Sequence, residues 1–507
     1  MRSQGWENGQ KASLQTIFVT NERWLIFLAI VGLCILIGLI GGAYIAFLTP
    51  LLATLVLIAL VGGFLMLRDI QWGLFALVGI IYLLPFAALP VNIGFSPTFL
   101  DLVLAVIFLV WVTSLATRKQ EEFVASPLAM PILIFILLAF ASFVAGLAHA
   151  RLSANVLRHF VEIIMCIALF FVVANHVRTQ KQLEQVVTLL ILAGFAAALI
   201  GVVLNVLPEA WTVRLLSVLG RVRYPTGWGV LRFIEDDPTL ARRATSTSVD
   251  PNVLGGMLIF VGALTASQLF AQKPLLRRVF VAPMLAVMAL CLYMTYSRSS
   301  LLGLVVALLL LGVARYRRLL LVILIMGVIA LLIPQTQVGI QRLQEGLRWE
   351  DRASRMRLGE YKDAFILISR YPWLGVGFAG TPDIDIYIGV SSVYLLIAEQ
   401  MGLVGLFVFL VIMAIFFVYT GRAWWRMRKG TRLESVLLGL VAGLAGAMAA
   451  GVFDHYLFNL NFPHAVALFW LFLGLAVAAT VVGEETGDTL GPLPVMRHSH
   501  EVMNGCL

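Results

Sequence analysis

The sequence predicts an all-α protein, a polytopic integral membrane helix bundle of about 12–14 transmembrane helices. Of its 507 residues, 61% are hydrophobic and only 12% are charged, and the mean hydropathy is +0.97. Soluble domains contain roughly 45–50% apolar and about 25% charged residues, so this composition excludes an ordinary soluble protein. At roughly 20 residues per crossing, the chain is long enough for that many spans and for long loops between some of them.

The individual helices follow from long apolar runs. These runs begin near Trp24, Leu51, Trp72, Leu102, Pro131, Phe160, Val186, Val253, Val279, Leu301, Leu319, Val393, Val436 and Ala465. Several are shorter than the roughly 20 residues that span comfortably, and only a glycine-rich stretch with Pro50 separates the first two, so the exact count stays open. The first run is long and no cleavage site with a soluble domain follows it, so we expect no cleavable signal peptide.

Orientation follows from Lys and Arg in the gaps between runs, because positive residues favour the cytoplasmic side. They occupy alternate gaps, at Arg118/Lys119, Arg178/Lys181, Lys273/Arg277/Arg278, Arg315/Arg317/Arg318 and Arg422/Arg426/Arg428/Lys429/Arg432. That side, with both termini, is expected to be cytoplasmic. The other side would hold the charge-poor gap 89–98, the turn at Arg298 and two long loops, about 207–252 and 334–392, which cross the membrane regardless of charge.

The chain is therefore expected to have four segments. They are a cytoplasmic N-terminal segment (1–23), an N-terminal transmembrane bundle with the first long loop (24–252), a core with the second long loop (253–483) and a disordered cytoplasmic tail (484–507).

Charge and cysteine content narrow the function. The net charge of +9 lies mostly in the short gaps, which favours membrane topology over nucleic-acid binding. The four cysteines have no paired spacing, and His498 with His500 in the tail would make a poor metal site. We expect no disulfide framework, no metal and no other cofactor.

We expect the functional site to lie near arginine residues at the outer membrane surface. Arg243 stands beside a Thr- and Ser-rich stretch that ends in Asp250-Pro251-Asn252, just before an apolar run. Asp followed by Pro is typical of a helix start, so Asp250 is expected to cap that helix. Arg298 is a single cation in a turn between two apolar runs, where it either snorkels to lipid headgroups or belongs to a functional site.

The second long loop contains a further arginine. Alternating charges with apolar residues at helical spacing, namely Leu358, Tyr361, Phe365 and Ile368, predict an amphipathic helix that carries Arg357. After this helix comes Gly375-Val-Gly377. These glycines either cradle phosphate or form a tight turn, and the turn is favoured because no Gly-Lys-Ser/Thr follows.

A few polar residues interrupt the apolar runs or flank them. Arg158 and Glu162 stand four apart at the start of one run, which predicts an ion pair inside the bundle. Asp454-His455 and His464 flank the last outer turn, where they either anchor the interface or act as a base.

Arginine thus recurs at three places on the outer side. Its planar guanidinium suits bidentate contact with phosphate. A diphosphate attached to a lipid is the anionic group that would lie at this depth, so the residues predict that substrate class.

At these residues the sequence resembles the O-antigen ligase and O-antigen polymerase superfamily of bacterial envelope enzymes. Arg243-Ala-Thr-Ser-Thr with Asp250-Pro251-Asn252 is similar to the family's Arg-Thr-Gly-Thr and Pro-Asn segment, and Ser297-Arg298-Ser299 is similar to its Ser-Arg turn. The residues that fit its later motifs are Arg357, Tyr361, Ala364, Pro372, Gly375, Gly377, Tyr394, Leu395, Gly402 and Gly405. The motifs cover roughly residues 243–405, and the rest of the chain agrees by hydropathy.

The resemblance implies a metal-independent glycosyltransferase of the bacterial inner membrane, with its two long loops in the periplasm. It would transfer or polymerise glycan from an undecaprenyl-diphosphate-linked donor to a sugar hydroxyl acceptor, with a flippase and a chain-length regulator as partners. The implied catalytic residues are Arg243, Arg298, Arg357 and Asp250, the arginines holding the diphosphate and stabilising it as it leaves. The implied substrate-binding residues are Asn252, Tyr361, Gly375, Gly377, Ser391, Ser392 and Tyr394.

One departure from the family concerns the acceptor. Ligases of this family usually carry His-Asn where the second long loop meets its helix, and here Ser391 and Ser392 stand in their place. That His is assigned to the acceptor hydroxyl, so its absence argues against ligation to a lipid A core and favours polymerisation or another acceptor. The residues that remain open as the base are Asp250, Glu360, Asp383, Asp385 and Glu399.

Two other classes of protein compete with this interpretation. A transporter or flippase for an anionic lipid-linked substrate would also place arginines on the outside, but it should show internal repeats, broken helices and ionisable residues deep in several spans. Only the region of Arg158 and Glu162 comes close to that pattern. A purely structural membrane protein would leave the arginine-bearing loops without a purpose.

Overall fold

The computed structural model describes residues 60–90, 92, 94–117, 126–148, 150–332, 352–380 and 389–488, with the single positions 31 and 42. The chain divides into two compact units, Met1–Arg68 and Asp69–Leu507. In the first unit, residues 60–68 are helical. All elements named below belong to the second unit. The predicted division at residues 252 and 253 stays a prediction.

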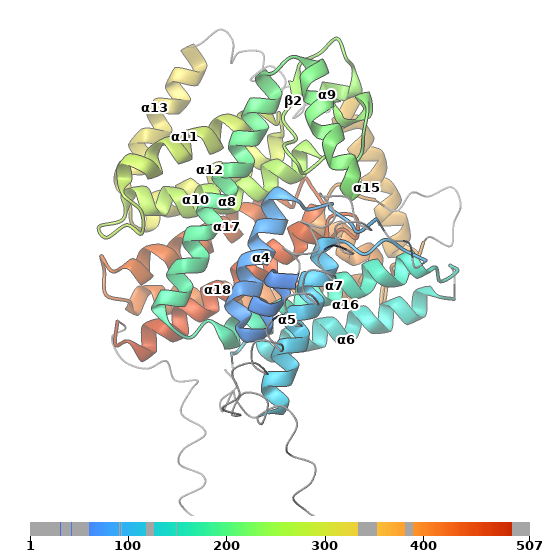
Figure 1. The fold of residues 1–507 in the computed structure, drawn as a ribbon, viewed down its shortest axis with the longest axis horizontal. Helices are drawn as coiled ribbons and strands as arrows, with labels where there is room; N and C mark the ends of the chain where they lie inside the picture. Colours follow the sequence, from blue (N-terminus) through green and yellow to red (C-terminus); the bar gives the residue numbers. More distant parts are fainter. Residues whose placement is uncertain are drawn as a thin grey trace, which may run out of the picture. The chain divides into compact units, whose positions relative to one another are not determined.

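The described part of the second unit is mostly helical, which confirms the predicted fold class (Figure 1). Its α-helices are α4 (Ile70–Leu83), α5 (Phe99–Ala116), α6 (Ala129–Gly146), α7 (Ala154–His176), α8 (Gln180–Val206), α9 (Glu209–Val218), α10 (Pro251–Phe270), α11 (Arg278–Met294), α12 (Arg298–Ala314), α13 (Arg317–Leu332), α15 (Arg352–Arg370), α16 (Val393–Arg426), α17 (Arg432–Ala450) and α18 (Pro463–Glu485). The short elements are the 3-10 helices η1 (Leu219–Val222), η2 (Trp228–Val230), η3 (Ile234–Asp236) and η4 (Tyr456–Phe458) and the antiparallel strands β1 (Arg232–Phe233) and β2 (Arg242–Arg243).

Many of these helices are suited to a bilayer. In the described residues, 8 helices of at least 18 residues are apolar enough to cross a membrane, namely α5, α6, α7, α8, α10, α16, α17 and α18. The helices α4, α11 and α12 are shorter but also apolar. Every predicted run from Trp72 onward coincides with a helix. The chain is therefore a multi-pass membrane protein, while the run from Trp24 and most of the run from Leu51 lie outside the described residues.

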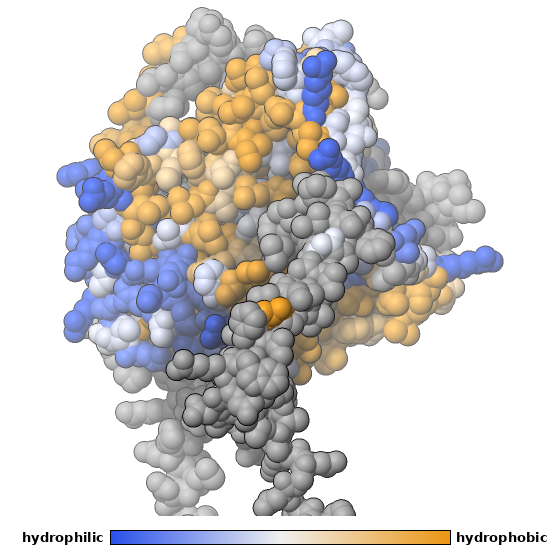
Figure 2. Space-filling view, viewed as in Figure 1, coloured by the Kyte–Doolittle hydropathy of each residue, from blue (hydrophilic) through white to orange (hydrophobic). Residues whose placement is uncertain are grey.

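Two helices form the centre of the bundle. In α18 the whole of the most apolar 18-residue window is buried, and in α10 the buried share is 89%, against 22% for α5. An apolar helix that is not buried in protein faces lipid, as expected for α5, α6 and α11. Figure 2 shows apolar surface over α6 and α11, where Leu137, Val144 and Val279 are exposed.

Small residues let the central helices approach closely. A Cβ atom on Gly446 of α17 would lie 2.4 Å from the carbonyl oxygen of Gly303 of α12, and one on Gly256 of α10 would lie 2.1 Å from the ring of Tyr456. Glycine at such contacts allows backbones to pack at short range, which is the usual basis of helix association in membranes.

The loops contact one another in two groups. The first long loop meets the turn at Arg298 through the Ala244 N–H, which donates to Met294 O (2.8 Å). On the basic side, Arg432 pairs with Glu184 (3.1 Å). Each contact joins chain segments that the predicted topology places on the same side of the membrane. The two contacts are therefore consistent with the predicted orientation.

The ion pair predicted between Arg158 and Glu162 is confirmed, and it has a third member. Arg158 Nη1 lies 3.6 Å from Glu162 Oε2 and 2.6 Å from Asp101 Oδ2. The third member, Asp101, was not predicted from the sequence. It belongs to a capping box with Thr98 at the start of α5, and the Thr-x-x-Asp spacing before an apolar run was the signal that could have identified this helix start.

The predicted amphipathic helix in the second long loop is confirmed as α15, but its buried face differs in part. Ala364 and Leu367 are fully buried, whereas Leu358 and Phe365 are exposed. Periodicity indicates that a helix has an apolar side, but the neighbours decide which apolar residues they cover.

Candidate functional site

Arg243 of the first long loop is held by two side-chain hydrogen bonds. It ends strand β2, and its guanidinium donates from Nε to Thr295 O (2.8 Å) and from Nη2 to Asn252 Oδ1 (2.6 Å). Burial lowers the pKa of Arg243, and the nearby carboxylates of Asp250 and Asp454 oppose that shift. An arginine remains charged under these conditions, so the loop holds a fixed, largely buried cation.

Asp250 caps helix α10, as predicted. Its carboxylate accepts hydrogen bonds from the Asn252 N–H (2.7 Å) and the Val253 N–H (3.0 Å), and Pro251 occupies the first turn. Burial raises the pKa of Asp250, while these bonds and Arg243 lower it. Asp250 and Asn252 together therefore join the start of α10 to Arg243.

The loop before this cap is strained. Ser246 and Val249 have φ angles of 51° and 60°. A β-branched residue in the left-handed region is a genuine outlier, and such strain persists only where the surroundings hold it. Ser246 Oγ donates to Ala197 O (2.8 Å), and this hydrogen bond helps to keep the strained backbone in place.

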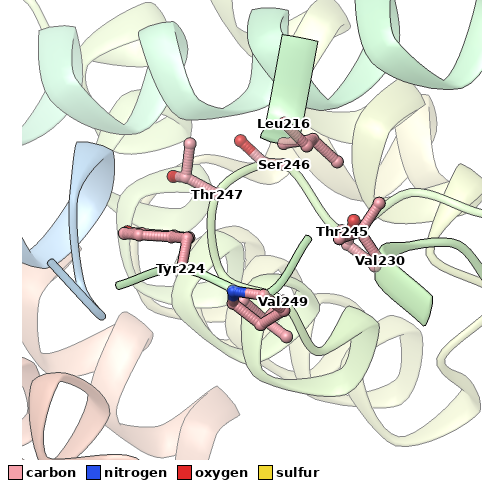
Figure 3. Close-up of a pocket in the computed structure, with 8 residues that line it drawn as sticks. Leu216, Tyr224, Val230, Thr245, Ser246, Thr247 and Val249 are labelled. Atoms are coloured by element: carbon pink, nitrogen blue, oxygen red, sulfur yellow. The ribbon is translucent and has the colours of Figure 1, made fainter. Parts of the chain in front are cut away.

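The hydroxyl-rich stretch packs against the first long loop. Figure 3 shows a pocket with Tyr224 and Thr247 on one side, Val230 and Thr245 on the opposite side, and Val249 between them. It has room for about one water molecule, so it is too small for a sugar or a diphosphate. The Thr- and Ser-rich stretch therefore does not itself form a substrate pocket.

Arg298 begins helix α12 and is partly buried. Ser297 caps this helix, because its Oγ accepts from the Ser300 N–H (3.4 Å). The preceding Tyr296 has a positive φ of 51°. Since Thr295, in the same turn, accepts a hydrogen bond from Arg243, the structure brings the first two predicted arginine sites together.

Arg357 on α15 completes the group. It is partly buried, and it lies close enough to Arg243 for its charge to lower the pKa of that residue. Two guanidinium groups held near each other repel, and a bound anion relieves the repulsion. The arrangement is suited to an anionic ligand that bridges the two.

The serines at the position of the family's His-Asn lie at the same end of the bundle. Glu360 Oε2 accepts from Ser391 Oγ (2.6 Å) and from the Ser391 N–H (3.0 Å). The hydroxyl of Tyr361 donates to Ser391 O (3.2 Å). Ser392 is buried at the cap position of α16, where its N–H donates to Val390 O (2.7 Å). A carboxylate is thus hydrogen-bonded where the family's His would stand.

Gly375 and Gly377 form a joint with a break in α16. Both have positive φ, as does Gly402 within that helix. The Gly375 N–H donates to Tyr371 O (3.2 Å) and the Gly377 N–H to Gln400 O (3.1 Å). These amides serve the turn, the interpretation that the sequence favoured, so substrate binding by the two glycines stays a prediction that these contacts do not support.

The remaining predicted residues lie apart from the arginines or outside the described residues. The Tyr394 hydroxyl donates to Met448 O (2.9 Å), between α16 and α17. Glu399 is buried, and neither of its carboxylate oxygens has a hydrogen-bond partner within the described part of the chain. Asp383 and Asp385 fall in the undescribed stretch 381–388.

The turn between α17 and α18 also reaches this site. Asp454 is buried, and its Oδ2 accepts from Ser299 Oγ (3.3 Å) beside Arg298. Its Oδ1 accepts from the His455 N–H (2.9 Å) and lies 3.3 Å from Nδ1 of the same residue. The sequence left this pair open between an interface anchor and a base. The sequence placed Ser299 in the Ser-Arg motif but did not predict its contact with Asp454, because the two residues lie 155 positions apart.

The fold defines a multi-pass membrane protein, and the contacts of Arg243 bring the start of α10 and the turn before α12 together. Residues 283–410 match the O-antigen ligase family, which confirms the resemblance over this stretch. The match includes Arg298, Arg357 and Ser391, and it relates the chain to membrane enzymes that ligate or polymerise glycans. No curated protein matches the chain.

Proposed function

We propose that the protein is a membrane glycosyltransferase that transfers or polymerises glycan from an undecaprenyl-diphosphate-linked donor on the periplasmic face of the inner membrane. The observation that carries the proposal is the placement of Arg243, which Asn252 holds at the start of α10 and the Thr295 carbonyl holds beside the turn of Arg298. The charge of Arg357, from the second long loop, acts on the same residue. The match of residues 283–410 to the O-antigen ligase family supports the reaction class.

In this proposal the arginines act on the leaving group. As the bond from the sugar to the phosphate breaks, negative charge accumulates on the diphosphate, and guanidinium groups already in place stabilise that charge. Asn252 and the Thr295 carbonyl hold Arg243 in position through its Nη2 and Nε. Arg298, at the start of α12, supplies the third cation, and no metal is required.

The acceptor would approach from the side of Ser391. The hydrogen bond from this serine to Glu360 occupies the position where ligases of the family carry the His assigned to the acceptor. We therefore propose polymerisation, or transfer to an acceptor other than a lipid A core. Tyr361 and Ser392 would line the same side.

The reaction is tested with the purified full-length protein and a synthetic undecaprenyl diphosphate oligosaccharide, with products followed by mass. Longer lipid-linked glycans establish a polymerase. Release of undecaprenyl diphosphate only when a second acceptor is added establishes a ligase. If neither product forms with several donors, the proposal is wrong.

Conservative arginine variants test the site itself. Arg243→Lys and Arg357→Lys keep the charge but lose the bidentate geometry, so the rate should fall roughly 10–100-fold, as expected for losing one charge-assisted hydrogen bond. Arg355→Lys is the matched control, because Arg355 is exposed on the same helix α15. Full activity in both site variants would remove the arginines from the mechanism.

A transporter or flippase of an anionic lipid-linked substrate is a second candidate, and one observation favours it. Helix α16 is broken at Gly402, and the carboxylate of Glu399 is buried three residues earlier. Broken helices and deep ionisable residues are typical of transporters. A flipping assay in liposomes with a labelled lipid diphosphate separates the two, since a transferase alone leaves the lipid in its original leaflet.

A further inference from the structure

We propose that Asp454 and His455 form the proton-accepting pair of the transfer reaction, in which His455 removes the proton of the acceptor hydroxyl and Asp454 positions its ring. This inference rests on the proposed glycosyl transfer. It assigns the base that the absent family His would otherwise supply.

The side chains of Asp454 and His455 are in ion-pair contact, and Asp454 is itself held in place by neighbouring residues. Asp454 is buried, and the two oxygens of its carboxylate accept hydrogen bonds from Ser299 Oγ and from the His455 N–H. The carbonyl of Asp454 also accepts from the Val393 N–H (2.9 Å) at the start of α16. Nδ1 of His455 lies 3.3 Å from Asp454 Oδ1. A proton on Nδ1 facing that carboxylate leaves Nε2 as the acceptor.

The ring is accessible as well as supported. The side chain of His455 is 26% exposed, against 5% for that of Asp454. A base must reach the proton that it removes, directly or through one water molecule. Asp454 is thus buried while part of His455 is exposed, which is the order required for His455 to remove a proton from the hydroxyl of the acceptor sugar.

The charges around the ring favour this role. Burial alone would lower the pKa of His455, but the hydrogen bond and charge of Asp454, together with Asp250 at the cap of α10 and Glu360 on α15, outweigh it, so the pKa is raised. Arg243 faces the same cluster from the first long loop, where it lies near Asp454. These carboxylates also stabilise the imidazolium that forms when the proton is transferred.

The other carboxylates near the site have different tasks. Asp250 accepts two N–H groups as a helix cap. Glu360 Oε2 already accepts two hydrogen bonds from Ser391. Glu399 is 1% exposed, inside α16. Of these described carboxylates and the Asp454–His455 pair, only His455 has both a neighbouring carboxylate and a partly exposed side chain.

The transfer step exchanges one bond at the anomeric carbon of the donor for another. The acceptor oxygen forms a bond to the anomeric carbon of the donor while the bond from that carbon to the phosphate oxygen breaks. The electron pair leaves with the undecaprenyl diphosphate, held by the arginines. The hydroxyl proton moves to Nε2 of His455 and passes to solvent before the next turnover.

The test is the His455→Gln variant of the full-length protein with the donor described above. We expect kcat to fall roughly 10²–10⁴-fold, the usual contribution of a general base, while the KM for the donor stays close to that of the wild type. In the wild type, activity should be lost as the pH falls through a pKa above the ordinary 6.5 of His, and in His455→Gln this acid limb should disappear.

Three variants complete the design. His176→Gln is the control, because His176 pairs with Asp69 (3.4 Å) at the end of α7 remote from the arginines, and it should behave as the wild type. Asp454→Asn should lower kcat and move the acid limb to lower pH, because His455 loses its neighbouring charge. In His455→Ala, added imidazole should restore part of kcat, which also separates loss of the base from misfolding.

Several outcomes would overturn the inference. A His455→Gln enzyme with the kcat and pH profile of the wild type would exclude a proton-accepting role. So would an effect confined to the KM for the donor, which would make His455 a diphosphate contact, or a His455→Ala variant that imidazole does not restore. A wild type that turns over no donor would contradict the proposed function instead.

Discussion

At the scale of single residues, Asp250 combines two tasks that substitution can separate. As the cap of α10 it accepts two N–H groups, and as a carboxylate it lies near Arg243. Asp250→Ala removes both and should lower the free energy of unfolding by about 1 kcal/mol, the usual value of a cap. Asp250→Asn keeps a cap and should retain the thermal stability of the wild type while losing activity. Thermal unfolding in detergent and the transfer assay measure the two effects.

Equal stability of Asp250→Ala and Asp250→Asn would contradict the capping role. Full activity of Asp250→Asn would show that its charge near Arg243 is dispensable. Thr431 caps α17, so Thr431→Ala is a control that should cost a similar stability without reducing the rate constant.

Residues with local partners were predictable from the sequence, and residues with distant ones were not. Asp250 and its N–H donors lie within three positions of one another, so the sequence carries the whole interaction. The hydrogen bond from Ser391 to Glu360 and the one from Ser299 to Asp454 join residues 31 and 155 positions apart. Such pairs depend on how the helices pack, which neither spacing nor propensity determines.

At the scale of elements, the joint between the Gly375–Gly377 turn and the break in α16 is a rigid unit. A Cβ on Gly402 would lie 2.2 Å from Trp373 O, and its φ is +70°. Gly402→Ala should therefore destabilise the protein by more than about 1 kcal/mol, because it adds a clash to an unfavourable backbone conformation. Gly359→Ala is the matched control, since nothing lies within 4 Å of its Cβ position on helix α15. It should leave stability unchanged or raise it slightly. Thermal unfolding of the two variants measures the difference.

If Gly402→Ala and Gly359→Ala unfolded at the same temperature, the joint would not be tightly packed. The sequence predicted α16 as one apolar run and gave no sign of the break, because a glycine within such a run is also typical of close helix packing. The hydrogen bond from the Leu403 N–H to Pro372 O (2.7 Å) shows that Gly402 marks a break in the helix and not only a close helix contact.

At the scale of the whole molecule, the two groups of loops predict a sidedness that labelling can measure. Arg221 in the first long loop and Lys273 between α10 and α11 are both exposed. In a variant with Cys34 and Cys506 replaced by serine, Arg221→Cys should react with a membrane-impermeant maleimide on spheroplasts. Lys273→Cys should react only after permeabilisation. Cys166 and Cys291 are buried and should stay unlabelled.

Labelling of Lys273→Cys on sealed spheroplasts, with Arg221→Cys protected, would invert the proposed orientation. The sequence alone carried most of this prediction, because the positive residues that set topology are counted along the chain. It did not provide the order of burial, in which α10 and α18 lie at the centre, because nearly all the spans are similarly apolar.

The contact between Arg243 and the carbonyl of Thr295 has a consequence for how such enzymes diverge. A peptide oxygen is present whatever amino acid occupies the position, so mutation at residue 295 can proceed without removing the acceptor, provided that the turn keeps its shape. Over evolutionary time the arginine would remain while its partner drifted. Half of the interaction that orients the cation would then leave no trace in a comparison of sequences.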